Sequence, residues 1–229
     1  MKNGYRTGRD VVSGRLYHYE RFCPEWLEGT LRNKQIHCSD PAKLNDPWDC
    51  RVSLDYTPML RDPLEREKML AFQRKALPPE TLNHPLRPIY EDRIRNSGGD
   101  HTGICLEFHV GNQLFLTAHG VQYREAYPTF VLTQMDTVNV LDVILTKAKC
   151  WEYEEEYRLV GSPKHRNGSP LNLYGDFLKL PDRSLLSVII GCNGDYKGVK
   201  KIVDAAAPEV RVIQIRRAPN QYNLMMALP

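Results

Sequence analysis

The chain has 229 residues, of which 41% are apolar and 26% charged, and its net charge is +3. These values are typical of a globular protein of about one domain, and they lack the strongly basic balance of nucleic-acid-binding proteins. Six cysteines form no Cys-x-x-Cys pair, so a structural zinc site is not expected. The N-terminus has no apolar signal-peptide core and no run reaches membrane-spanning length, so we expect a cytoplasmic protein without a membrane partner.

The hydrophobic pattern predicts a flexible arm over residues 1–14 and a single α+β domain over residues 15–229. We expect a mixed, mostly antiparallel sheet, with helices concentrated in the N-terminal half. Alternating or β-rich runs predict strands at 15–21, 35–39, 102–108, 121–123, 150–161, 185–191 and 210–216. Helical spacing predicts helices at 24–33, 62–77, 133–149 and 196–207, with Trp26, Leu27 and Leu31 on the inner face of the first.

The segment 147–160, KAKCWEYEEEYRLV, has the most unusual pattern in the chain. Read as a strand, it places Glu154, Glu156 and Arg158 on one face and Glu155 on the other. Acidic residues are depleted in strands and repel each other on one face, so this pattern indicates either a polar site or a solvated edge strand. We expect a site at Glu154 and Glu156, with Glu155 dispensable.

Four strings together resemble the bacterial family catalogued as domain of unknown function 2971. They are LYHYE at 16–20, SDPAKLNDPWD at 39–49, HTGICLEF at 101–108 and LTKAKCWEYEEEYRLV at 145–160. The most specific parts are the Asn-Asp-Pro turn that begins at Asn45 and the spacing of Lys147 and Trp151 before the acidic run. The resemblance covers nearly the whole chain after residue 15, and the family is defined without an established activity.

The order of motifs is also similar to that of toxin-like ADP-ribosyltransferases. These enzymes use an early strand with His or Arg and a late strand with a catalytic Glu, often as Glu-x-Glu; here His18 and Glu154-x-Glu156 occupy these places. The resemblance implies an enzyme that takes NAD as its substrate without a metal, in a bacterial defence or toxin system. It implies that Glu156 is catalytic and stabilises developing charge at the ribose, while His18 holds a ribose hydroxyl.

Further residues are expected to contact NAD through their side chains. A tyrosine can stack on nicotinamide, and an arginine can hold a phosphate or pair with a glutamate. The Asn-Asp-Pro turn can wall a pocket, although it also fits a purely structural Asx-turn, and His18 also fits a hydrogen-bonded structural histidine. The residues expected to bind NAD are Tyr17, Asn45, Asp46, Lys147, Glu154 and Arg158.

Two other functions stay open at this point. Family members carry a Trp-x-His-Tyr run before the strand at 101–108, whereas this chain has IYEDRIRNSGGD in its place. The absence of the run favours a non-catalytic binding or sensor module of the same fold. Asp46, Asp49, Glu154, Glu156 and Lys147 include the residue types of a metal-dependent nuclease, but no Asp…Glu-x-Lys string occurs. The acceptor of ADP-ribose is open between a protein, a nucleic acid and a small molecule.

Overall fold

The structure is a computed structural model that describes residues 6–39, 53–55, 61, 62, 64, 67, 101–131, 140–161, 171, 173–217, 219 and 224–227. The chain divides into two compact units. Unit 1 takes its described residues from Met1–Ser39, Asp92–Gly120 and Tyr157–Pro229, and unit 2 takes them from Asp40–Glu91 and Val121–Glu156. Helices and strands are both present, which confirms the α+β class. The single domain over residues 15–229 stays a prediction.

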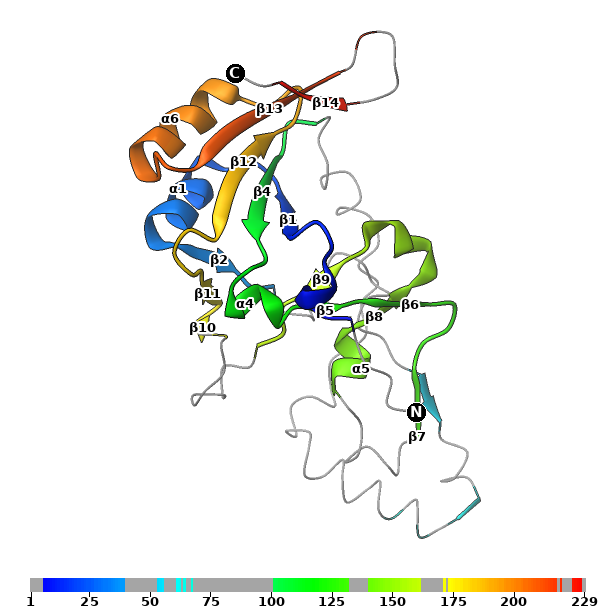
Figure 1. The fold of residues 1–229 in the computed structure, drawn as a ribbon. Helices are drawn as coiled ribbons and strands as arrows, with labels where there is room; N and C mark the ends of the chain where they lie inside the picture. The colour runs from blue at the N-terminus through cyan, green and yellow to red at the C-terminus, as the bar shows by residue number, and fades with distance from the viewer. Residues whose placement is uncertain are drawn as a thin grey trace, which may run out of the picture. The chain divides into compact units, whose positions relative to one another are not determined.

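Unit 1 is built on a five-stranded sheet in the order β1-β4-β12-β13-β14 (Figure 1). Neighbouring strands run antiparallel except β12 and β13, which are parallel. The helix α6 (Tyr196–Ala206) connects this parallel pair, as parallel neighbours require a crossover. The strands span Arg15–Glu20 (β1), Ile104–His109 (β4), Leu185–Ile190 (β12), Arg211–Arg217 (β13) and Leu224–Ala227 (β14).

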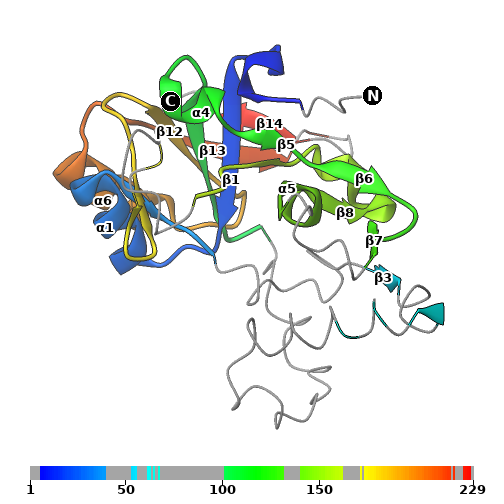
Figure 2. The same ribbon diagram turned by 90° about the horizontal axis from the view of Figure 1, so that it is seen from below.

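The helices α1 (Pro24–Asn33) and α6 lie together on one side of this sheet (Figures 1 and 2). Alternate residues of a strand point to opposite faces, and residues four apart on a helix share a face. Leu27 and Leu31 of α1 therefore pack with every second residue of β4. Fully burying each such side chain contributes roughly 1.5–3 kcal/mol. The buried core includes Leu27, Leu31, Ile104, Leu106, Phe108, Val188, Ile190, Val199 and Val203.

The ends of both helices follow from local sequence. Pro24 occupies the first turn of α1, where its missing N–H costs nothing, and the helix ends at Lys34 in the left-handed conformation. The side chain of Asp195 caps α6 by accepting from the Gly198 N–H at 2.9 Å. Trp26 is 64% exposed, so its predicted place on the inner face is wrong: it lies about 100° around the helix from Leu27.

The remaining elements of unit 1 are short. A three-stranded sheet has the order β10-β11-β2, and β5 pairs with β9. Residues of the predicted N-terminal arm contact the unit: Thr7 bridges His119, and the Gly8 N–H donates to the Ala118 carbonyl at 2.8 Å. These elements span Gly8–Asp10 (a 3₁₀ helix), Gln35–His37 (β2), Gln113–Leu116 (α4), His119–Gly120 (β5), Tyr157–Arg158 (β9), Leu173–Tyr174 (β10) and Phe177–Lys179 (β11).

The described residues of unit 2 form two parallel strand pairs. The strand β3 pairs with β7, and β6 pairs with β8. The described elements span Ser53–Asp55 (β3), Gln122–Arg124 (β6), Thr129–Val131 (β7), Val140–Ile144 (α5), Thr146–Ala148 (β8) and Lys149–Glu154 (a 3₁₀ helix).

The predicted helices have mixed outcomes. The helices at 24–33 and 196–207 are confirmed. The helix predicted at 133–149 is wrong at its C-terminal end, because the chain leaves α5 after Ile144 and enters β8 at the β-branched Thr146. Most of the helix predicted at 62–77 lies outside the described residues, so the concentration of helices in the N-terminal half stays a prediction. Within the described ranges, no helix is both long and apolar enough to cross a membrane.

Candidate functional site

The acidic segment is not the long strand that its alternation predicts. Residues Lys149–Glu154 form a 3₁₀ helix directly after β8, and the strand is limited to Tyr157–Arg158. Glu155 has a left-handed backbone with φ of 45° and turns the chain between them. The prediction of a strand over 150–161 is therefore wrong. A physical reason is that a helical turn separates consecutive carboxylates around its axis and so reduces their mutual repulsion, whereas one face of a strand would hold them side by side.

The structure nevertheless brings Glu154 and Glu156 together, through a shared cation. The Nζ atom of Lys147 lies 2.6 Å from Oε2 of Glu154 and 3.3 Å from Oε2 of Glu156. The Lys147 side chain is only 10% exposed, while the two glutamates are 33% and 30% exposed. Burial acts to lower the pKa of Lys147, but the two carboxylates outweigh it and raise the pKa above its usual range. Lys147 is therefore a permanently charged bridge.

The side chain of Tyr123 contacts the Lys147 cluster, which we define as Lys147, Glu154 and Glu156. The hydroxyl of Tyr123 accepts a hydrogen bond from the Glu156 backbone N–H at 2.8 Å. Parallel pairing of β6 with β8 places Tyr123 opposite Lys147 in the register. Burial is the main cause that raises the pKa of Tyr123, so the phenol stays neutral. The backbone at Glu156 is thus fixed to the strand pair that carries Lys147.

An aromatic pair lies on the 3₁₀ helix beside the Lys147 cluster. The Nζ atom of Lys147 is 5.1 Å from the centroid of the Trp151 ring, within the range of a cation–π contact. The rings of Trp151 and Tyr153 have centroids 6.0 Å apart, and Tyr153 is 73% exposed. This arrangement offers carboxylates for hydroxyl groups of a ligand and an accessible aromatic surface for a flat ring.

The other predicted site residues lie elsewhere or outside the described residues. Tyr17 and His18 lie on β1, and Arg158 lies on β9 opposite His119; all belong to unit 1, whereas the Lys147 cluster belongs to unit 2. The register pairs Tyr17 with Glu107 and His18 with Leu106, so these two neighbours face opposite sides of the sheet. The Nε2 atom of His18 is 3.8 Å from Oε2 of Glu20. Asn45 and Asp46 lie outside the described residues.

Glu107 is a buried charged side chain on the second strand of the unit 1 sheet, and it was not among the predicted site residues. It lies on β4 and is 2% exposed. Its carboxylate accepts hydrogen bonds from the guanidinium of Arg15 and from the hydroxyl of Ser187. The sequence indicates this feature through a single carboxylate inside the apolar run ICLEF, because a fully buried glutamate is almost always paired.

The partners of Glu107 keep it ionised. Burial acts to raise the pKa of this carboxyl, but the hydrogen bonds from Ser187 and Arg15 and the charges of Arg15 and Arg211 together hold the pKa below its usual range. Arg211 Nη2 lies 3.6 Å from Oε2, and the Tyr17 hydroxyl lies 3.5 Å from Oε1. The Glu107 cluster, defined as Arg15, Tyr17, Glu107, Ser187 and Arg211, is a second polar constellation in the molecule.

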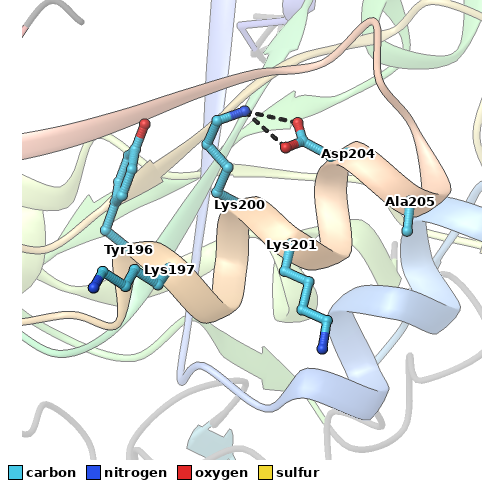
Figure 3. A pocket seen from close by; sticks show the side chains of 6 residues that line it. All are labelled: Tyr196, Lys197, Lys200, Lys201, Asp204 and Ala205. Atoms are coloured by element: carbon cyan, nitrogen blue, oxygen red, sulfur yellow. Dashed lines mark hydrogen bonds and ion pairs between the residues drawn. The ribbon is translucent and has the colours of Figure 1, made fainter.

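A surface hollow of about 610 Å³ lies along α6 and is lined by Tyr196, Lys197, Lys200, Lys201, Asp204 and Ala205 (Figure 3). Lys200 pairs with Asp204 at 2.8 and 2.9 Å, while Lys201 points to another side of the helix (Figure 3). An i,i+4 ion pair among lysines of one helix is typical of a solvated face. This hollow holds none of the predicted site residues.

Among the residues that the structure describes, no group of three His, Cys, Asp or Glu side chains is arranged to hold a metal ion. Asp46 and Asp49, two of the residues considered for a nuclease site, fall outside that part of the chain. The metal-dependent nuclease therefore stays a prediction.

Comparison of the chain with protein-family models, with curated proteins and with solved structures gave no match in any of the three. The resemblances to the family of unknown function and to the ADP-ribosyltransferases accordingly stay predictions.

Proposed function

We propose that the chain is an ADP-ribosyltransferase-like protein that uses NAD as its substrate, with Glu156 as the catalytic carboxylate. The observation that carries the proposal is the convergence of Glu154 and Glu156 on Lys147, beside the aromatic pair of Trp151 and Tyr153. This cluster supplies two carboxylates, a fixed cation and a ring surface within one short stretch of unit 2.

The chemistry requires little more than a carboxylate held at the ribose. When the bond between C1′ and the nicotinamide nitrogen breaks, its electron pair leaves with nicotinamide and positive charge develops at the ribose ring. A carboxylate placed there stabilises this charge, and an acceptor then adds to C1′ and loses a proton. Lys147 offsets the repulsion between Glu154 and Glu156, which lets both negative charges stay close to one ligand.

The other residues expected to contact NAD are His18, Tyr17 and Arg158 of unit 1 and Asn45 and Asp46 outside the described residues, and their contacts stay predictions. The protein would act in the cytoplasm of a bacterium, in a defence or toxin system.

Release of nicotinamide from NAD tests the catalytic role of Glu156. We expect Glu156→Gln to lower the rate about 10²–10³-fold, as for loss of one group that stabilises transition-state charge. Glu155→Gln is the matched control, because Glu155 is the adjacent exposed carboxylate and forms no part of the cluster. Equal loss in both variants, or no release by the wild type with any added acceptor, would contradict the proposal.

A non-catalytic binding module is the second candidate, and one observation favours it. Both carboxylates of the cluster already have a protein cation as partner, as in a structural ion-pair network. Such a module would bind NAD, giving heat in a titration, but would release no nicotinamide.

A further inference from the structure

The face of the unit 1 sheet opposite α1 and α6 carries a row of polar side chains across four neighbouring strands. The register aligns Tyr17 of β1 with Glu107 of β4, Glu107 with Ser187 of β12, and Ser187 with Arg211 of β13. Arg15 lies two residues before Tyr17, so it emerges on the same face. The row is independent of the Lys147 cluster, which belongs to unit 2.

Positive charge is in excess in this row. Arg15 contacts Oε1 of Glu107 and Arg211 approaches Oε2, so two cations share one carboxylate. Their side chains are 45% and 60% exposed, whereas the Glu107 side chain is 2% exposed. Among the described residues, neither arginine has a second carboxylate partner. Each guanidinium has five N–H donors, so most of them stay available to solvent or to a ligand.

Burial of a carboxylate contributes little to the stability of a fold, because its desolvation is unfavourable. Removing a charge from water costs several kcal/mol, and apolar replacements of buried ion pairs are often neutral or stabilising. A buried carboxylate between two half-exposed arginines does, however, fix the orientation of both guanidinium planes. Orientation of this kind favours bidentate binding of a phosphoryl group.

We propose that Arg15 and Arg211 form a binding site for the phosphoryl group of a small-molecule ligand, with Glu107 as the positioning residue. Exposed tyrosine rings continue the same face of β1: Tyr17 is 42% exposed and Tyr19 is 78% exposed. An aromatic ring attached to the phosphoryl group stacks on these tyrosines. The ligand class is therefore a phosphorylated compound with a flat ring, for which a nucleoside monophosphate is the simplest probe.

Calorimetric titration at matched ionic strength tests the site with AMP, ribose 5-phosphate, inorganic phosphate and adenosine. We expect the three phosphate compounds to bind, AMP most tightly, and adenosine to give no heat. Arg211→Gln should weaken AMP binding at least tenfold. Arg216→Gln should leave it unchanged, because Arg216 lies on the same strand but faces the other side of the sheet.

Two further variants make the result decisive. Arg211→Lys keeps the charge but loses the planar fork, so we expect weaker binding than wild type even if Arg211→Gln fails to fold. Glu156→Gln should leave AMP affinity unchanged, which separates this site from the proposed catalytic one. No affinity of the wild type for any phosphate compound would overturn the proposal, as would equal weakening by Arg211→Gln and Arg216→Gln. Equal affinity for AMP and ribose 5-phosphate would overturn the role of the tyrosines.

Discussion

Replacement of Glu107 by Gln tests whether the central sheet depends on a buried charge. Gln keeps the volume and can still accept from Ser187, but the two arginines lose their charged acceptor. Hydrogen bonds to charged groups contribute about 1.5–3 kcal/mol each. Since the arginines are 45% and 60% exposed and regain water, we expect a total loss of about 2 kcal/mol in the free energy of unfolding. Glu107→Ala should lose about 3–4 kcal/mol, because it also leaves a cavity.

Urea unfolding, followed by circular dichroism, measures these losses. Because its partners hold the pKa of Glu107 below the usual range, the stabilisation is fully present above the unfolded-state pKa of about 4.3. It is lost as the pH falls through the lower folded-state pKa. The difference between wild type and Glu107→Gln should be full at neutral pH and should shrink in acid. A difference below about 0.5 kcal/mol at neutral pH, the size of an ordinary surface substitution, would refute the reasoning.

Three other predictions concern single positions. Lys147→Met removes the cation that two carboxylates share and should lower the free energy of unfolding by about 1–2 kcal/mol in urea; no loss would show that the ion pairs are marginal. Gly191→Ala would place a Cβ 2.0 Å from a backbone carbonyl oxygen, and it should therefore lower the melting temperature of the protein. Gly29→Ala is the control, because a Cβ at this position of α1 meets open space; it should raise the free energy of unfolding by up to about 1 kcal/mol. Burial raises the thiol pKa of Cys105 to about 12, so Ellman's reagent should label the exposed Cys150 in the native protein and Cys105 only after unfolding.

The helices α1 and α6 and the strands β1, β4, β12 and β13 all lie within a few residues of their predicted places. Helical spacing of apolar residues or a run of β-branched and apolar residues marks most of them, whereas β1 is predicted from a weak alternation alone. The C-terminal end of the helix predicted at 133–149 and the strand predicted at 150–161 are wrong for a common reason. Short elements there are set by tertiary pairing, such as that of β6 with β8, which local period cannot reveal.

The sequence predicts most of the residues that form the candidate site, but not the backbone structure that brings them together. The charge pattern singles out Glu154, Glu156 and Arg158, and the family resemblance adds Lys147. Lys147 does meet the two glutamates, whereas Arg158 lies on β9 of unit 1. The three residues of the Lys147 cluster meet through a helical turn and a left-handed Glu155 rather than along a strand face. Glu107 was missed because its partners come from three other strands, and no local pattern connects them.

Calorimetric titration with NAD is the most direct test of the proposal that the Lys147 cluster binds this substrate. Wild type and Glu155→Gln should give the same binding isotherm, and Glu156→Gln should bind at least tenfold more weakly, a change of about 1.4 kcal/mol in binding free energy. Absence of heat in the wild type would contradict the proposal, and so would equal affinity in all three proteins.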